Sequence, residues 1–143
     1  MKVIVDTNIM FSILLKDKSK ERDVLFLSED LEFFSCRFAI VELFKHKEKI
    51  SKFSKLTEDE ILTSLYRLLK IINFYNEDLI SREILKKAYE LCSGIDEKDT
   101  LFVALTLEIN GYLWTGDKKL KEELISKGFY KFWPSENARL REN

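Results

Sequence analysis

The sequence has few of the residues that cross-link, hinge or interrupt a chain. Its 143 residues include two cysteines, one proline and four glycines. Cys36 and Cys92 are too few for a disulfide framework and too far apart for a zinc motif, which suits a reducing compartment, and we expect a cytoplasmic protein. Because no Pro/Gly/Ser-rich linker, repeat or low-complexity tract divides the chain, we expect one domain over residues 1–143.

The charge balance and the hydropathy exclude further classes of protein. Lys and Arg total 24 against 25 for Asp and Glu, a formal net charge of −1, so there is no global basic field and any nucleic-acid binding must be local. No apolar run approaches the roughly eighteen residues of a membrane span. The apolar stretch 9–15 follows Asp6 and is not followed by a small-residue cleavage site, so we do not expect a signal peptide. We expect a soluble protein.

Short apolar runs alternate with amphipathic segments along the chain. Strands are predicted at 3–5, 31–35, 71–75 and 112–114, with an edge strand at 129–133 before Pro134. Helices are predicted at 8–15, after a cap at Ser19, at 37–53, from a capping box of Thr57 and Glu60, at 84–91, from Asp99 or Thr100 to 107 with an Asn110-Gly111 cap, and at 118–127. This alternation predicts a parallel sheet covered by helices on both faces.

Two of the predicted strands end on an aspartate. Asp6 follows the run Val3-Ile4-Val5, and Asp117 follows Tyr112 to Gly116. In open α/β sheets ligands bind beyond the carboxyl ends of the strands, so acids at these positions are placed for chemistry. The alternative is that each aspartate only caps the helix that follows it, because aspartate is a favoured N-cap residue.

Two further acidic positions stand out. Glu42 lies inside an otherwise apolar segment, where an unpaired carboxylate is costly unless it meets a cation or a metal ion. Its alternative partners are Lys45 and His46, which share its helical face. Asp96 and Asp99 precede the most apolar helix, where acids also favour the positive end of the helix dipole. We prefer Asp99, because it directly adjoins the apolar residues.

These acids come from separate segments of the chain, and no Cys or His motif accompanies them. The four are Asp6, Glu42, Asp99 and Asp117. An oxygen-only set suits Mg²⁺ or Mn²⁺, which would keep the carboxylates ionised and activate a water for in-line attack on a phosphodiester. The one histidine, His46, lies among lysines and is expected in solvent, so serine or cysteine nucleophiles have no visible base.

Four segments together resemble the PIN-domain (PilT N-terminus) family. They are Val5-Asp6-Thr7-Asn8, Glu42 after Ser35, the run from Asp96-Glu97-Lys98-Asp99 to Leu105, and Trp114-Thr115-Gly116-Asp117-Lys118-Lys119-Leu120. The resemblance covers nearly the whole chain. It implies an α/β fold of three layers (α/β/α), Rossmann-like, with a parallel sheet of about five strands in the order 3-2-1-4-5. It also implies a Mg²⁺- or Mn²⁺-dependent ribonuclease.

The resemblance also assigns roles to residues. It implies that Asp6, Glu42, Asp99 and Asp117 are the catalytic and metal-binding acids, that Asp96 can contribute to the metal site, and that Thr7, Asn8 and Thr115 are polar supporting residues. Small members of this size resemble VapC-type toxins of toxin–antitoxin pairs. The resemblance therefore implies a homodimer and an antitoxin partner.

Three questions stay open at the level of the sequence. Lysines at 45, 49, 52, 118, 119 and 121 flank the acids and could meet RNA phosphates, or they could form an ordinary solvated face. A PIN-like domain without turnover, acting as an RNA-binding or assembly module, is the alternative to a nuclease. A phosphatase or phospho-receiver ranks lower, because Asn8 occupies the second acid position of the Asp-x-Asp motif.

Overall fold

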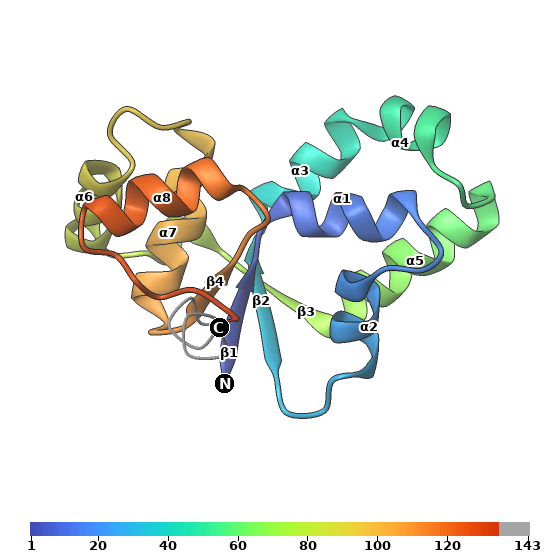
Figure 1. Ribbon diagram of the computed structural model, residues 1–143, viewed down its shortest axis with the longest axis horizontal. Coiled ribbons are helices and arrows are strands. Elements are labelled where there is room, and N and C mark those ends of the chain that lie inside the picture. Colours follow the sequence, from blue (N-terminus) through green and yellow to red (C-terminus); the bar gives the residue numbers. More distant parts are fainter. Residues whose placement is uncertain (135–143) are drawn as a thin grey trace.

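Parallel strands alternate with helices in the computed structural model, which describes residues 1–134 (Figure 1). The sheet order is β3-β2-β1-β4, and all three pairings are parallel. The elements are β1 (Lys2–Val5), α1 (Thr7–Leu15), α2 (Lys20–Leu27), β2 (Glu32–Cys36), α3 (Phe38–Lys45), α4 (Lys47–Phe53), α5 (Glu58–Ile71), β3 (Ile72–Tyr75), the 3₁₀ turn η1 (Glu77–Leu79), α6 (Arg82–Leu91), α7 (Lys98–Glu108), β4 (Tyr112–Trp114) and α8 (Lys118–Ser126). The predicted α/β class and parallel sheet are confirmed.

The predicted fifth strand is reduced to a single bridge beside β4. Leu113 donates its N–H to the Lys131 carbonyl at 2.8 Å and accepts from the Trp133 N–H at 2.9 Å, in parallel pairing with Phe132. The Phe132 N–H instead bonds to the Tyr130 carbonyl at 3.0 Å. This bond between residues two apart forms a γ-turn at Lys131, which takes the backbone out of the extended conformation that a longer ladder needs. The sheet therefore has four strands rather than about five within the described residues, in the predicted order.

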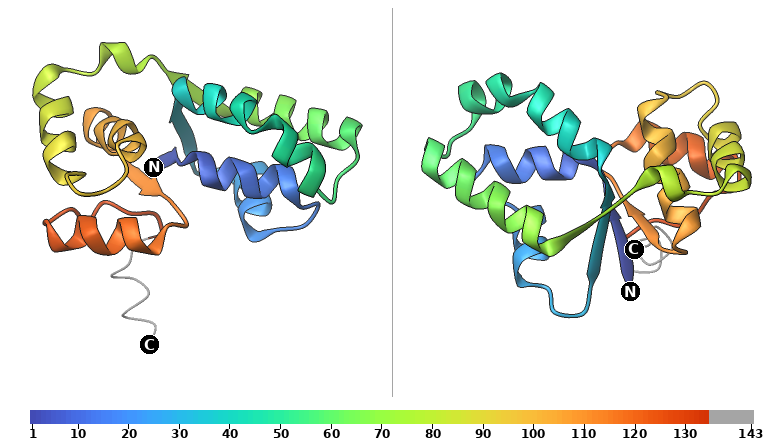
Figure 2. Two further views of the ribbon diagram at one scale, coloured as in Figure 1. Left: turned by 90° about the horizontal axis from the view of Figure 1, so that it is seen from above. Right: turned by 180° about the vertical axis from the view of Figure 1, so that it is seen from behind.

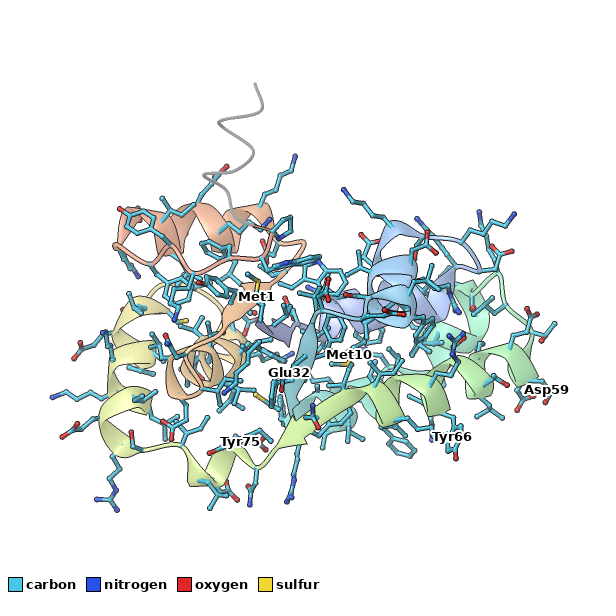
Figure 3. The ribbon with its side chains drawn as sticks, turned by 90° about the horizontal axis from the view of Figure 1, so that it is seen from below. Met1, Met10, Glu32, Asp59, Tyr66 and Tyr75 are labelled. Carbon is cyan, nitrogen blue, oxygen red and sulfur yellow. The ribbon has the colours of Figure 1, made fainter. Side chains whose placement is uncertain are left out.

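The helices cover both sides of the sheet. Figures 1 and 2 show α6, α7 and α8 on one side and α1 to α5 on the other. Met10 of α1 is fully buried in the core, whereas Tyr66 of α5 is 61% exposed at the outside (Figure 3). The central helix α7 buries five consecutive residues from Phe102 to Thr106, as expected for a helix that packs on β1, β2 and β4.

Most of the predicted helix caps are present. Thr57 and Glu60 form the predicted capping box, with hydrogen bonds of 3.2 Å and 3.1 Å. At the end of α7, however, Asn110 and not Gly111 takes the left-handed conformation, with φ of 54°. Gly111 is needed for close packing instead, because a Cβ there would lie 2.5 Å from Ile4 Cδ1 and 2.9 Å from the Lys2 carbonyl oxygen.

The helix predicted over residues 37–53 is two helices that meet at His46. This residue has φ of −106° and ψ of 19°, and it ends α3 and precedes α4. Contact with α1 accompanies the break, because the His46 ring packs against Phe11 while Leu43 and Ile50 both stay in the core. No proline or glycine marks the position. Within residues 1–134, no helix combines the length and apolar character that a bilayer crossing requires.

Candidate active site

The carboxyl ends of β1 and β4 bring two aspartates together. Asp6 directly follows β1, and its backbone N–H donates to the Trp114 carbonyl, the last residue of β4, at 3.1 Å. Asp117 follows three residues later in that segment. Asp6 is only 4% exposed, which is unusual for an ionisable side chain. The predicted meeting of two strand-end acids at one edge of the sheet is therefore present.

Thr115 connects these two aspartates. Its hydroxyl donates to Asp6 Oδ2 at 2.7 Å and accepts from the Asp117 N–H at 3.1 Å. Both aspartates also cap helices. Asp6 Oδ1 accepts from the Asn8 N–H at 3.4 Å, and Asp117 Oδ1 accepts from the Leu120 N–H at 3.1 Å. Each aspartate therefore caps a helix and also lies at the shared edge of the sheet. The Asn8 side chain is exposed.

Glu42 reaches this edge from α3. Its Oε1 accepts a hydrogen bond of 2.9 Å from the Thr7 hydroxyl, at the start of α1. The contact comes from another helix and not from Lys45 or His46 on its own helical face. Thr7 thus holds Glu42 as Thr115 holds Asp6. The two threonines occupy positioning roles around two of the four acids, and each hydroxyl has a defined carboxylate partner.

The two acids ahead of the apolar helix lie in different environments. Asp96 is exposed, and its Oδ1 caps the Lys98 N–H at 3.1 Å. Asp99 is half-buried in the first turn of α7. The charges that act on Asp99 come from Asp6, Asp117 and Glu42 as well as from Asp96. Asp99 is therefore the member of this pair that faces the other acids.

The electrostatics of this acidic edge, defined as Asp6, Glu42, Asp99 and Asp117, are unfavourable for an isolated chain. Burial, and to a smaller extent the charges of the neighbouring carboxylates, together raise the pKa of Asp99 to about 7. Burial also raises the pKa of Asp6, against the hydrogen bonds from Thr115 and Asn8 that lower it. Every charge named as acting on these two groups is negative. Such a site gains from an added cation.

The oxygen donors fit a divalent cation chemically. Hard cations such as Mg²⁺ prefer carboxylate oxygen, and positive charge would relieve the repulsion among the acids. Within residues 1–134, however, no three Asp, Glu, His or Cys side chains already form a closed metal-binding group. The acids gather at one edge of the sheet but do not yet form a complete metal-binding group. Thiol chemistry is disfavoured at this edge, because burial raises the pKa of Cys36 and keeps the thiol protonated.

The environment of His46 differs from the prediction. The prediction of a solvated side chain is incorrect, because His46 is half-buried and its ring lies 5.6 Å from the Phe11 ring, edge to face at 70°. The physical reason is the break between α3 and α4, which turns this residue toward α1. A signal was available, since His46 follows Glu42 by four residues and shares its face. The lysines at 45, 49, 52, 118 and 119 are exposed, as expected.

The fold and the acidic edge define a parallel α/β domain with carboxylates gathered at the carboxyl ends of its strands. A family model described as "PIN domain" matches residues 4–130. The chain therefore belongs to the PIN-domain family, as the motifs indicated.

Two relatives extend this comparison. The chain is 27% identical over 128 residues to Ribonuclease VapC3 of Pyrobaculum aerophilum, covering 86% of this chain and 95% of that protein. It is also similar in fold to the crystal structure of VapBC2 from Rickettsia felis bound to a DNA fragment from its promoter. That match has a TM-score of 0.66 at 16% identity and covers 85% of this chain and 92% of the other.

Proposed function

We propose that the chain is a metal-dependent ribonuclease that hydrolyses RNA phosphodiester bonds at the acidic edge. The observation that carries the proposal is the convergence of four carboxylates at one edge of the sheet, where burial and negatively charged neighbours raise the pKa of both Asp6 and Asp99. A purely structural cluster of this kind would be a net cost. The relationship to Ribonuclease VapC3 supports the choice of RNA as substrate.

The residues of the chain have separate tasks in this proposal. Asp6 and Asp117 hold one end of the site, and Thr115 fixes both through its hydroxyl. Glu42 and Asp99 close it from α3 and α7, with Thr7 fixing the carboxylate of Glu42. Asp96 lies at the rim, where its carboxylate already serves the backbone of α7. The hydrogen bonds keep the acidic oxygens oriented before substrate arrives.

Mg²⁺ or Mn²⁺, held by Asp6, Glu42, Asp99 and Asp117, would supply an activated water and neutralise charge on the phosphate under attack. The carboxylates alone would repel an RNA phosphate. The exposed lysines of α3 and α4 follow Glu42 in the chain, and those of α8 follow Asp117. Their positive charges can attract phosphates toward the edge.

One observation favours a second candidate, a PIN domain without turnover that serves as an RNA-binding or assembly module. No three of the acids within residues 1–134 form a ready metal-binding group. If the edge cannot contract around an ion, the same fold would bind without cutting. Metal binding and cleavage, measured on the same preparation, separate the two candidates.

The experiment is cleavage of a mixed-sequence RNA by purified protein with Mn²⁺ or Mg²⁺. Chelator is one control, and Asp6→Asn is the test variant, because asparagine keeps the shape and the helix cap while removing the charge. Asp59→Asn is the matched control, since Asp59 is exposed on α5, at the far end from the sheet (Figure 3).

The proposal predicts cleavage that needs the metal, survives Asp59→Asn and falls more than about a hundredfold in Asp6→Asn, beyond the loss usual for residues that only orient a ligand. Cleavage that survives Asp6→Asn would refute the assignment of the acids. Metal binding without cleavage of any RNA tested, or neither activity, would favour the non-catalytic module.

The finer proposal is that this ribonuclease is the toxin of a toxin–antitoxin pair. The structural neighbour is a VapBC assembly, which supports a protein partner. The surface offers a place for one in the apolar groove between α3–α4 and α5, a hollow of about 720 Å³. We define the apolar groove by its main apolar lining residues, Ile40, Leu43, Phe44, Ile61, Leu62, Leu65 and Leu69.

Four of these groove residues are at least 40% exposed, and apolar patches of this kind mark binding surfaces. An antitoxin helix with apolar residues at a spacing of three and four fits such a groove.

Expression of the chain alone should arrest growth of a bacterial host, whereas Asp6→Asn should not. Co-expression with the product of the reading frame adjacent to this chain's own should restore growth, and Phe44→Ser with Leu62→Ser should prevent that rescue. Equal growth with wild type and Asp6→Asn would contradict the toxin assignment, and a second copy seated in the groove would appear instead as a dimer that the same substitutions dissociate.

A further inference from the structure

A second, smaller hollow lies directly beside the acidic edge. It encloses about 330 Å³ between α1 and the α3–α4 junction, and its main lining residues are Asn8, Phe11, His46, Lys49 and Phe53. The left panel of Figure 2 shows α1 running alongside these two helices. Its volume is near the lower end of the roughly 300–1,000 Å³ typical of small-molecule sites. This size suits one flat ring system rather than a run of stacked bases.

The hollow and the acidic edge are neighbours along α1 and α3, because Asn8 and His46, which line the hollow, lie close in the chain to Thr7 and Glu42. The hydrogen bond from Thr7 to Glu42 joins α1 to α3 at the acidic edge. Asn8 is the next residue after Thr7, and His46 lies one helical turn beyond Glu42. A ligand in the hollow would therefore adjoin a phosphate at the acids.

The chemistry of the hollow is opposite to that of the acidic edge. Its seven lining residues include three aromatic rings, one amide and one lysine, and no carboxylate. Lys52, which lines the apolar groove and not this hollow, places a second ammonium over the Phe53 ring, 5.4 Å from the ring centre. Aromatic faces bind nucleobases by stacking, and amides bind their polar edges. Lysines at the rim suit the phosphates that connect one base to the next.

The Phe53 ring remains largely open to solvent, although the Lys52 ammonium lies over it. Phe53 is 63% exposed, although a phenylalanine ring gains by burial. Phe11 and His46 meet edge to face, so the ring that is edge-on is not covered by its partner on either face. A purely structural cluster would bury Phe53 against the others. The exposure of this ring beside two half-buried ones is what a stacking platform requires.

We propose that this hollow binds the base of the nucleotide next to the scissile phosphate, with stacking on Phe53 and His46, the Asn8 amide on the base edge and Lys49 on the adjoining phosphate. The inference rests on the proposed ribonuclease function, which it deepens with a specificity site. Because the Asn8 amide can pair only with a matching base edge, the cut has a base preference at this position.

The sequence supplies a direct probe of this site, because His46 is the one histidine of the chain. In protein purified without a polyhistidine tag, the His46 ring Cε1–H signal in a ¹H–¹³C NMR spectrum needs no assignment. We would titrate each of the four nucleoside 5′-monophosphates, and then a mixed RNA tetranucleotide, into the protein in chelator at fixed pH 7.5. The proposal predicts a saturable shift of this signal that differs in strength among the bases.

Phe53→Ala is the test variant, because the ring is exposed and its loss should leave the core intact. Phe44→Ala is the matched control, since Phe44 is equally exposed at 69% but lines the apolar groove. Phe53→Ala should weaken nucleotide binding about tenfold, within the range for loss of one stacked base. It should also raise KM for RNA by about the same factor, leave kcat within about twofold and flatten the base preference, while Phe44→Ala changes none of these.

The outcomes separate this inference from the function on which it rests. RNA cleavage with an unmoved His46 signal, or with equal KM in wild type and Phe53→Ala, would overturn the base site and leave the ribonuclease standing. Nucleotide-dependent shifts of His46 without any RNA cleavage would support the base site and refute the nuclease. If Phe53→Ala abolished binding of the protein partner while nucleotide binding was unchanged, the hollow would be a partner contact and the proposal would be wrong.

Discussion

The acidic edge and the apolar groove lie on opposite faces of α3. Glu42 points to the acids, whereas Ile40 and Phe44, two residues to either side, line the groove. At the acidic edge, hydrogen bonds orient the carboxylates of Asp6, Glu42 and Asp117, and the charges that raise the pKa of Asp6 and Asp99 are those of other carboxylates. In the groove, the charged lining residues are two of each sign, Lys47, Lys52, Glu48 and Glu58, while the apolar Ile40 and Phe44 are 40% and 69% exposed. The two surfaces are thus unfavourable for the isolated chain for opposite reasons.

This contrast indicates what each surface can accept. Buried negative charge is relieved by a cation, and its oriented oxygens can act on a substrate. Exposed apolar side chains are stabilised when the apolar surface of a partner covers them, which supplies binding affinity but no catalytic group. Substitutions should therefore affect the two regions differently. Changes at the edge should act on metal binding, catalysis and pH dependence, and changes in the groove on association alone.

Among the substitutions that leave the four acids in place, the largest effect is expected from Thr115→Val. The Asp6 carboxylate would lose its 2.7 Å hydrogen bond in a buried position, which should cost about 1–3 kcal/mol of unfolding free energy. Loss of the orienting contact should also weaken Mn²⁺ binding about 10- to 100-fold. Chemical denaturation and calorimetric titration measure the two effects. Thr115→Ser keeps the hydroxyl and should preserve both, so an equal loss in this variant would show that packing and not the hydrogen bond is responsible.

A smaller effect, of opposite sign, is expected from Asp99→Asn in chelator. The folded-state pKa of Asp99 is about 7, against about 3.9 in an unfolded chain, so the folded state binds the extra proton between these values. Stability of the wild type should therefore fall as pH rises from about 4 to 7. Removing the charge should stabilise the protein at pH 8 by about 1–2 kcal/mol, a value discounted because Asp99 is partly exposed.

Thermal unfolding of Asp99→Asn and wild type at pH 4, 6 and 8 tests this expectation. The difference should be smallest at pH 4, where Asp99 is protonated in the folded state and about half protonated in the unfolded chain. Asp59→Asn, on the exposed face of α5, should follow the wild type at every pH. A difference that does not change with pH would mean that the charge of Asp99 does not destabilise the folded state.

The smallest effect on folding is expected in the groove. Phe44→Ser replaces a side chain that is 69% exposed, so unfolding free energy should change by no more than about 0.5 kcal/mol. Cleavage of RNA should be unchanged, while association with a partner or a second copy should weaken. Denaturation and sedimentation on the same samples measure the contrast. A loss of cleavage in Phe44→Ser would break the separation between the two regions.

Much of this arrangement could be predicted from local signals. Apolar runs that end on Asp6 and Asp117 located the edge, and a parallel sheet necessarily brings such ends together. Caps such as Thr57 with Glu60 fixed helix starts, because they are satisfied within four residues. These features depend on neighbours in the chain and on one general rule of topology.

The features that were missed depend on contacts between distant segments. The break at His46 has no local signal, and it follows from packing against Phe11, thirty-five residues earlier. The fifth strand is reduced to one bridge because a local turn between Tyr130 and Phe132 takes the backbone out of the extended conformation. Likewise, the sequence favoured Asp99 over Asp96 only through its position next to the apolar residues, whereas the structure leaves Asp96 exposed and brings Asp99 under the charges of the other acids.

The most direct test of the acidic edge as a cation site is calorimetric titration of Mn²⁺ into the protein at pH 7 and at pH 8.5, in buffers of different ionisation heat. Because the pKa of Asp99 is about 7, binding at pH 7 should release about half a proton per protein, and almost none at pH 8.5. Asp6→Asn should bind far more weakly. An absence of binding, or binding of equal strength in Asp6→Asn with no proton release at pH 7, would contradict the proposal that these carboxylates form the metal site.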